Sequence, residues 1–442
     1  VTRGANSALW GSDAATAVIN IITVDGSRID PHRSPYGRYV TNFDYEFRNK
    51  QRTVNLMWGK QFGNAEAMLS YTYTKSEGKP QYDYRSGASG PTINTTRFEP
   101  YAIMPGSHDF YLKAGVVDLS INAGFSELQT GQGQNNQFEE AERGNAGYRR
   151  MRWLWADLSY EVEMNRSISN ETKFRTDWRQ FSARRSGALS ASFSNNEESG
   201  IEIENITRFK QDPWGGLLGF AYSRNDFERN QFPLDSAIFP LAGDESIMSA
   251  FDELSYALRP NLQVTVGGRI EDEDLRSYTN EFMPRASIVY AISDAWTVRH
   301  VYSSGIVRPP REYNVIDGGW HDAVDVPNNF LSGTHLPTQS VTQEIQFVYQ
   351  AEHSSAGVTL FQIDMENLFA FINQSITGVS GPAGTYTLRY GSLDSVTSRG
   401  IELEPEHRFN EDLRVYGNLT YLNAFRNNDK VNGDQISSQD VR

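Results

Sequence analysis

Two polar stretches carry most of the side chains that could bind a ligand. The first, residues 76–107, contains Tyr82, Tyr84 and Arg85. Aromatic rings stack on flat ligands, and guanidinium groups donate paired hydrogen bonds to oxygen anions. This set therefore suits a catecholate-type ferric chelate or a sugar. The alternative is an aromatic girdle at a membrane interface, next to a solvated polar loop.

The second stretch, residues 304–338, holds cations together with ring systems. Its candidate ligand-binding residues are Arg308, Arg311, Tyr313, Trp320, His321 and His335. Neutral imidazole is a good ligand for haem iron, which makes His321 the residue to test for haem binding. The alternative is that His321 is an ordinary histidine of a solvated loop.

No pattern of residues points to catalysis or to a bound cofactor. The chain lacks the His-Glu-x-x-His, Gly-x-Ser-x-Gly and phosphate-binding Gly-x-x-x-x-Gly-Lys-Ser/Thr patterns. It has no cysteine, which excludes a disulfide scaffold and Cys-ligated metal sites. Acidic clusters at 271–274 and 427–429 suggest calcium, but Lys430 stands where the second needs an oxygen ligand. We expect solvated outer loops at both, no metal site, and a protein that is not an enzyme.

The composition fits a membrane barrel better than a soluble enzyme. Of the 442 residues, 38% are hydrophobic, 12% are aromatic and 36 are glycine. The mean hydropathy is only −0.55. In a transmembrane β-barrel every second strand residue faces water, and aromatic residues gather at both interfaces. No run approaches the ~20 apolar residues of a membrane helix, and a net charge of −14 argues against a nucleic-acid partner.

Segments of roughly ten residues alternate apolar with polar side chains, as expected for strands between lipid and a wet lumen. For example, Leu262, Val264 and Val266 alternate with polar neighbours. The predicted fold class is all-β, a large antiparallel transmembrane β-barrel. We predict strands at 36–48, 51–61, 65–75, 108–115, 116–126, 149–162, 167–182, 199–211, 214–226, 245–258, 261–272, 281–292, 295–303, 339–351, 355–366, 396–409 and 412–424.

Short turns and long polar stretches alternate between these strands. The long stretches are 76–107, 127–148, 183–198, 227–244, 304–338 and 367–395. Bacterial barrels have short periplasmic turns and long extracellular loops in this order. Plugged transporters have about 22 strands, so we expect the roughly seventeen predicted here to be a truncated set, short of about five C-terminal strands. The first residues contain no signal peptide and are likewise expected to lie inside a longer protein.

The first residues carry the most specific pattern. Residues 1–14 are VTRGANSALWGSDA and residues 17–23 are AVINIIT. This segment resembles the end of the plug domain of TonB-dependent outer-membrane receptors, with Trp10 where the family has Tyr. The resemblance implies the C-terminal part of a plug domain at 1–30 and a 22-stranded type of barrel, incomplete at its C-terminus, at 31–442.

Later segments resemble the same family in the same order. Residues 282–310 look like its paired strands ending in a Phe-Arg-Ala-Pro box, although Val307 and Pro309 replace the Phe and the Ala. Residues 329–339 resemble, in degenerate form, the segment that follows this box. Residues 398–404, SRGIELE, match the family's Arg-Gly-x-Glu-Leu-Glu strand.

The resemblance implies TonB-dependent active uptake of a scarce, bulky nutrient across the bacterial outer membrane, in the first place a ferric siderophore or another iron complex. The implied partners are the TonB-ExbB-ExbD complex, whose contact segment we expect to precede this sequence, outer-membrane lipid and lipopolysaccharide, and the cargo. We expect a monomer. Haem, vitamin B12 or an oligosaccharide are alternative cargos. A passive porin or a surface adhesin is the alternative of another class, but open porins carry no plug.

The resemblance also implies a lock between plug and barrel. In the family, the Arg of the plug's Arg-Gly pair meets carboxylates of the barrel wall, and Arg3 holds that place here. Candidate partners are Glu344, Glu402 and Glu404. A charge in a crowded lumen needs an opposite charge, because an isolated buried charge is costly. The alternative is that Arg3 meets lumen water or a backbone carbonyl.

Overall fold

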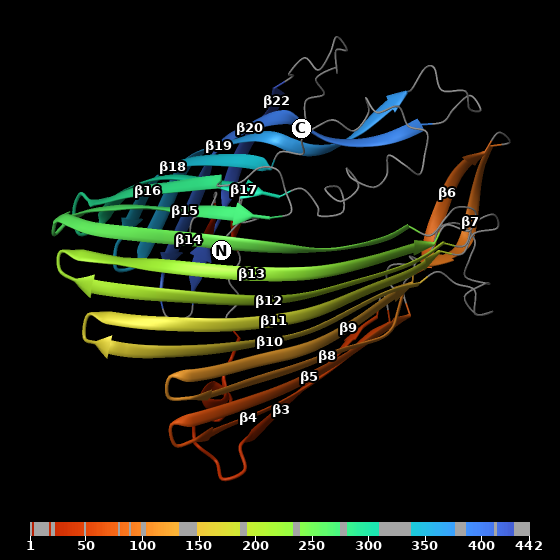
Figure 1. Ribbon diagram of the computed structural model, residues 1–442, viewed down its shortest axis with the longest axis horizontal. Coiled ribbons are helices and arrows are strands. Elements are labelled where there is room, and N and C mark those ends of the chain that lie inside the picture. The colour runs from red at the N-terminus through yellow and green to blue at the C-terminus, as the bar shows by residue number, and fades with distance from the viewer. Residues whose placement is uncertain are drawn as a thin grey trace.

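The computed structural model describes residues 2–3, 17–18, 23–47, 50–77, 80–87, 90–98, 103–131, 148–185, 192–232, 239–274, 281–308, 337–375, 386–410 and 413–427. Nearly all of them lie in antiparallel strands that curve into one barrel-type wall (Figure 1). No helix in this part of the chain is long and apolar enough to cross a membrane.

Eighteen strands follow one another around the wall in chain order. They are β3 (Arg38–Glu46), β4 (Gln51–Phe62), β5 (Ala65–Glu77), β8 (Ile103–Val116), β9 (Leu119–Gly131), β10 (Tyr148–Asn165), β11 (Ile168–Arg185), β12 (Ser192–Gln211), β13 (Trp214–Phe232), β14 (Phe239–Arg259), β15 (Leu262–Glu273), β16 (Glu281–Ala291), β17 (Trp296–Val307), β18 (Thr338–Gln350), β19 (Ser354–Ser375), β20 (Tyr386–Arg408), β21 (Arg414–Tyr416) and β22 (Leu419–Asn427). In the circular strand order β22 neighbours β3, but no residue register joins the described parts of these two strands. The sheet is therefore not closed there.

Alternation along each strand gives the wall two chemically different faces. On β10, Leu154 and Leu158 are 52% and 40% exposed and point outward, away from the rest of the chain. Asp157 and Ser159, which lie on the opposite face of the strand, hydrogen bond to Arg175 and Glu171 on the lumen side. The outer face is therefore apolar and the inner face polar, as a barrel in lipid requires.

The short turns all lie at one end of the wall (Figure 1). Between β4 and β5 the chain reverses through Gly63 and Asn64, and Gly63 has φ +60°, a left-handed conformation that glycine adopts without strain. At the opposite end, β6 (Pro80–Gly87) and β7 (Gly90–Phe98) form a separate two-stranded sheet. By the rule for bacterial barrels, the turn end is periplasmic and the other end extracellular.

The predicted fold class and all seventeen predicted strands are confirmed. The segment 412–424 is divided into β21 and β22, which both pair with β20. Several strands reach further toward the extracellular end than predicted, into stretches expected to be loops; these are β12, β14, β19 and β20. The stretch 76–107, also expected to be a loop, contains the β6–β7 hairpin. Beyond the apolar band both faces of a strand are polar. The alternation of apolar and polar residues therefore no longer indicates where the strand ends.

Three small elements precede the wall. They are β1 (Thr2–Arg3), β2 (Ala17–Val18) and a short helix, α2 (Gly26–Ile29). The helix packs on the inner face of β4, where Ile29 is only 6% exposed. Gly59 of β4 permits this approach, because a Cβ there would lie 2.6 Å from the Cβ of Ile29.

Candidate functional site

The inner face of β10 to β12 carries ion pairs that cross neighbouring strands. Asp157, Arg175 and Glu202 are register partners on these three strands. The Arg175 guanidinium donates to Asp157 (Nε–Oδ1 2.8 Å) and to Glu202 (Nη1–Oε2 3.3 Å). Further along β11, Glu171 accepts from Arg208 Nη2 at 2.7 Å. Opposite charges on facing positions hold the strands in register and give the lumen a fixed charged lining.

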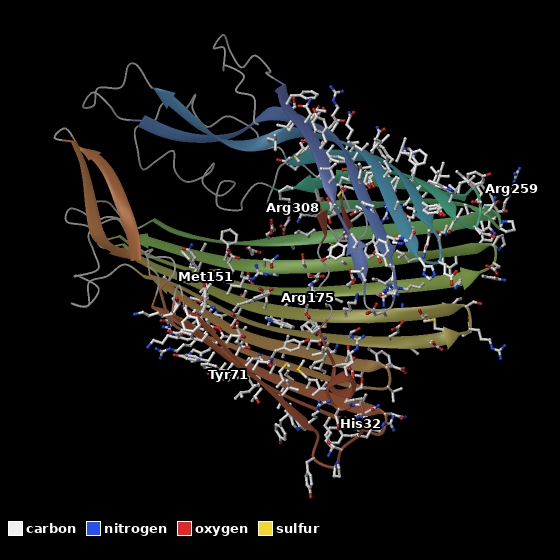
Figure 2. All side chains as sticks on the ribbon, turned by 180° about the vertical axis from the view of Figure 1, so that it is seen from behind. His32, Tyr71, Met151, Arg175, Arg259 and Arg308 are labelled. Carbon is white, nitrogen blue, oxygen red and sulfur yellow. The ribbon has the colours of Figure 1, made fainter. Side chains whose placement is uncertain are left out.

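A more deeply buried cluster lies on the inner face of β14 and β15 at the end of β17. Arg269 contacts Glu271 (Nε–Oε1 2.6 Å) and donates to Ser249 Oγ at 2.7 Å. Arg308, the residue after β17, pairs with the same Glu271 and with Glu273 (Nε–Oε2 3.1 Å). None of the four charged side chains is more than 10% exposed. Figure 2 labels Arg308 and Arg175, which mark these two groups of the inner wall.

This cluster corrects one expectation from the sequence. Residues 271–274 were predicted to be a solvated outer loop, but Glu271 and Glu273 are in β15, face the lumen and pair with arginines. Only Asp274, the next residue, lies past the strand, where it accepts a hydrogen bond from Ser246 N at 2.7 Å. The sequence could not reveal the pairing, because Arg308 is 37 positions from Glu271.

Arg308 is the only predicted ligand-binding residue whose side chain belongs to the described part of the chain. Tyr82, Tyr84 and Arg85 belong to β6, at the extracellular end of the wall, but their side chains lie outside the description. The remaining predicted residues lie outside it altogether; these are Arg311, Tyr313, Trp320, His321 and His335. Their convergence on one ligand therefore stays a prediction.

The three carboxylates of the predicted lock share the inner face of the wall. Glu344 lies on β18, and Glu402 and Glu404 lie on β20. Glu402 is 7% exposed and accepts a hydrogen bond from Thr420 Oγ1 at 3.3 Å. Arg3 belongs to β1, which pairs with β2, and its side chain lies outside the description.

Helix α2 is fixed to the wall by polar contacts that were not predicted from the sequence. Ser27 N donates to Glu66 Oε2 on β5 at 3.0 Å. Asp25 caps the helix, accepting from Arg28 N at 2.8 Å and from the Ser27 hydroxyl at 2.6 Å. Partial burial acts to raise the pKa of Asp25, but these hydrogen bonds and the nearby Lys113 lower it overall. The signal available in the sequence was an Asp directly before a single helical turn.

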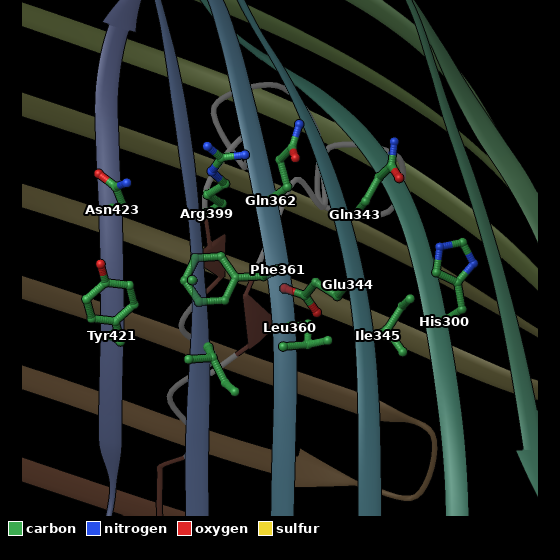
Figure 3. A pocket seen from close by; sticks show the side chains of 12 residues that line it. His300, Gln343, Glu344, Ile345, Leu360, Phe361, Gln362, Arg399, Tyr421 and Asn423 are labelled. Atoms are coloured by element: carbon green, nitrogen blue, oxygen red, sulfur yellow. The ribbon is translucent and has the colours of Figure 1, made fainter.

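A hollow on the outer face of β17 to β22, with polar side chains in part of its lining, was not predicted from the sequence (Figure 3). It has a volume of about 470 Å³ and lies on the side of the wall away from the lumen. The outward side chains that line it include His300, Gln343, Gln362, Arg399 and Asn423. The sequence held one indication of this hollow. Its polar residues occupy strand positions on the same face as apolar residues two positions away, such as Ile345, Leu360 and Ile401.

Comparison with known proteins assigns the wall to a family. The family model described as TonB dependent receptor-like, beta-barrel, matches residues 4–440. Two curated relatives, both named iron-regulated outer membrane virulence protein and both from Vibrio cholerae serotype O1, are 22% and 21% identical to the chain. Each match covers 96% of this chain and 62% of the relative, so the chain spans less than two thirds of the length of these relatives.

Solved structures share the fold at low sequence identity. The siderophore receptor PirA from Pseudomonas aeruginosa is similar with a TM-score of 0.64 and 16% identity, over 96% of this chain and 73% of PirA. The FrpB iron transporter from Neisseria meningitidis (F3-3 variant) has a TM-score of 0.70 and 12% identity, over 96% and 67%. The copper transporter OprC has a TM-score of 0.66 and 12% identity, over 96% and 65%. The two-faced wall and the family match over nearly its whole length place this chain in the TonB-dependent receptor family of bacterial outer-membrane β-barrels.

Proposed function

We propose that this chain works in the TonB-dependent active uptake of a scarce, bulky iron complex, a ferric siderophore, across the outer membrane. The observation that carries the proposal is the contrast between the two faces of the wall. The inner face is lined by ion-paired side chains such as Arg175 and Arg308, and the outer face is mostly apolar. A wide lumen with a charged lining accepts a polar cargo, and the outer face holds the wall in lipid.

The choice of an iron complex rests on the relatives. The curated relatives are named as iron-regulated, and the similar structures include a siderophore receptor and an iron transporter. The similar copper transporter makes copper a necessary comparison in any test of the cargo. The proposed activity is binding and gated movement of the cargo rather than catalysis.

In this proposal, energy comes from the TonB-ExbB-ExbD complex and acts on a plug. Residues 1–30 form the C-terminal part of the plug domain and residues 31–442 form the barrel. The position of α2 supports this division, because Ile29 lies against the inner surface of the wall at Gly59. A plug must make such contacts with the lumen side of the barrel.

Cargo contact is assigned to the extracellular end. Tyr82, Tyr84 and Arg85 belong to β6, which lies at that end. The candidate residues between 311 and 335, which lie outside the described residues, are proposed to share in the contact. Arg308 has a different role in this proposal, because Glu271 and Glu273 already neutralise its guanidinium. It ties the end of β17 to β15.

The lock between Arg3 and the wall is part of the same proposal, with Glu402 as the favoured partner because it is buried on the inner face. We expect Arg3→Glu to release the plug and to allow passive leakage of a large antibiotic through the complete receptor. Adding Glu402→Arg should restore the seal by exchanging the two charges. Unchanged leakage in Arg3→Glu would contradict the lock.

The cargo is tested by growth of a strain that lacks its own iron receptors and carries the complete gene for this protein. We expect growth on one class of ferric siderophore, and loss of that growth when TonB is deleted. Parallel cultures supply haem, vitamin B12, an oligosaccharide or copper as the limiting nutrient. Rescue by one of these alone would replace the cargo, and rescue without TonB would overturn active uptake and favour a passive porin.

A further inference from the structure

Three aromatic side chains follow one another on the same face of β8 and β10. Trp153 and Trp155 are two positions apart on β10, and Tyr111 on β8 belongs to the same register row as Trp155. The centre of the six-membered and five-membered ring system of Trp155 is 5.8 Å from the Tyr111 ring and 6.1 Å from the Trp153 ring. Aromatic pairs interact at such distances. We call these three residues the lumen aromatic strip.

Strand register places the strip on the inner face of the wall. The row of Trp155 continues across the neighbouring strands through Gly124 of β9, Tyr111 of β8, Ser70 of β5 and Met57 of β4. Met57 is two positions before Gly59, which contacts α2 on the inner face, and alternation puts both residues on that face. The Tyr111 hydroxyl also lies 3.0 Å from Thr23 Oγ1, just before α2. The strip therefore begins where the proposed plug meets the wall.

From this contact the strip runs toward the extracellular end. Trp155 is opposite Gly124, which is five residues beyond Leu119 at the turn end of β9. Five strand residues span about 17 Å, and Trp153 lies two residues, or about 7 Å, further along. After the tilt of barrel strands, both indoles lie within the height of an apolar band about 25 Å tall. A cargo that enters from the extracellular end therefore passes both indoles before it reaches the level of Thr23.

Gly124 lets the Trp155 indole lie across β9. A Cβ at Gly124 would come within 2.7 Å of the Cε2 and Nε1 atoms of Trp155, so the ring covers the backbone at this position. One ring face therefore lies against the wall, and the other is turned toward the lumen. Trp153, the next residue of the strip, is 44% exposed. Neither indole N–H donates a hydrogen bond to a residue that the structure describes, whereas that of Trp178 donates to Glu197.

The charges beside the strip are already balanced. The guanidinium carbon of Arg179 lies 5.5 Å from the centroid of the Trp153 ring, and Arg179 Nε lies 2.7 Å from Asp177 Oδ2. In the register row of Trp153, Asp109 accepts a hydrogen bond from the Ser126 hydroxyl. The strip therefore offers a ligand two ring faces and two N–H donors, and no unpaired charge of its own. Such a surface binds a flat ring by stacking.

We propose that the lumen aromatic strip is a stacking site for an aromatic ring of the cargo, on the wall between the extracellular end and the plug. This inference rests on the proposed uptake of an iron complex and adds a preference to it. Chelates that carry aromatic rings bind the strip, and chelates without rings do not. Trp153 and Trp155 supply the ring faces, and Gly124 is a positioning residue that sets the angle of Trp155.

Fluorine NMR of the complete receptor, purified with fluorotryptophan in place of tryptophan, tests the contact directly. The probe is a gallium tris-catecholate, a diamagnetic substitute for an iron chelate with rings. Gallium citrate is the matched probe, because it is also anionic but has no ring. Trp153→Phe and Trp155→Phe assign the two resonances. We expect both to shift with the catecholate alone, and the resonance of Trp178 to stay, because its register partner Leu154 faces outward.

Uptake of radioactive iron from the two corresponding iron complexes tests the preference. We expect Trp153→Leu to lower uptake from the ferric catecholate about fivefold and to leave uptake from ferric citrate unchanged. Trp178→Leu, which removes a tryptophan from the outer face of the neighbouring strand, is the control and should change neither. Gly124→Ala keeps every tryptophan but must displace the Trp155 indole. It should lower catecholate uptake as well, and it replaces Trp153→Leu if that variant fails to fold.

Several outcomes would overturn the stacking site. Resonances of Trp153 and Trp155 that do not move, or that move equally with gallium citrate, would reject ring binding. Equal losses of both iron complexes in Trp153→Leu would show that the strip holds the plug instead of the cargo. Failure of the proposed function looks different. In that case neither complex is taken up in a TonB-dependent way, while the catecholate still shifts the two resonances.

Discussion

Two groups of arginines face outward from this wall, and they are neutralised differently. On β10, Arg150 and Arg152 both contact Glu127 of β9, each at 2.8 Å. On β20, Arg399 has neutral register partners, Gln362 and Asn423, and no ion pair among the described residues. Both groups lie toward the extracellular end of the outer face.

The difference follows from strand register. Arg152 and Glu127 are directly opposed across β10 and β9, so the pairing of these strands brings the charges together. No such carboxylate stands opposite Arg399. The wall therefore pairs its cations with a carboxylate in one region, and in the other it places the guanidinium over the Phe425 ring, 5.0 Å from the ring centroid.

Among the ion pairs of the wall, the buried cluster on the inner face should contribute most to stability. Glu271→Gln removes the carboxylate that Arg269 and Arg308 share, in a place where both arginines are buried. We expect the complete receptor to lose about 3 kcal/mol of unfolding free energy in urea, because breaking a buried pair leaves an uncompensated charge. Asp244→Asn, which breaks an exposed pair with Arg224, should cost less than about 1 kcal/mol. Equal losses would show that burial does not decide the value of these pairs.

Glu127→Gln should leave Arg150 and Arg152, the paired arginines of the outer face, without their ionic partner. The expected loss of stability is about 2 kcal/mol, since hydrogen bonds to charged groups are removed from two half-buried arginines. Glu127→Asp keeps the charge and serves as the control. Unchanged stability in Glu127→Gln would show that the ion pairs with Arg150 and Arg152 do not contribute, and it would break the comparison between the two groups.

Arg399→Gln should leave stability almost unchanged in lipid-free detergent, within about 0.5 kcal/mol, because the side chain has no ionic partner to lose. Thermal unfolding of the two proteins measures the difference. A large loss in Arg399→Gln would mean that the contact with the Phe425 ring contributes as much to stability as the ion pairs do.

The smallest expected effect concerns the Asp25 cap, outside the wall. The pKa of Asp25 is lowered from its ordinary value of 3.8. Its ionised form therefore stabilises the fold above about pH 4, and this contribution is lost as the pH falls through the lower pKa of the folded state. Asp25→Asn keeps the cap but removes the charge, and should flatten this acid step by about 0.5 kcal/mol. An identical pH profile for both proteins would rule out a role for the charge.

Sequence patterns predicted the strands well because the apolar band imposes alternation on each strand by itself. They failed where both faces are polar, as in the β6–β7 hairpin and the extracellular extensions of β12 and β20. They also failed wherever function depends on which strands are neighbours. The contact of Arg308 with Glu271 and the alignment of Arg399 with Asn423 are properties of register, which no single segment contains.

The most direct test of this account is which face of the wall meets lipid. The sequence has no cysteine, so single substitutions place one spin label at a chosen position of the complete receptor in a bilayer. A label at Ile345→Cys, which is on the outer face, should collide readily with oxygen dissolved in lipid and be shielded from a water-soluble nickel chelate. A label at Gln346→Cys, the next residue, should show the reverse. Equal accessibility at both positions, or the opposite order, would contradict the two-faced wall.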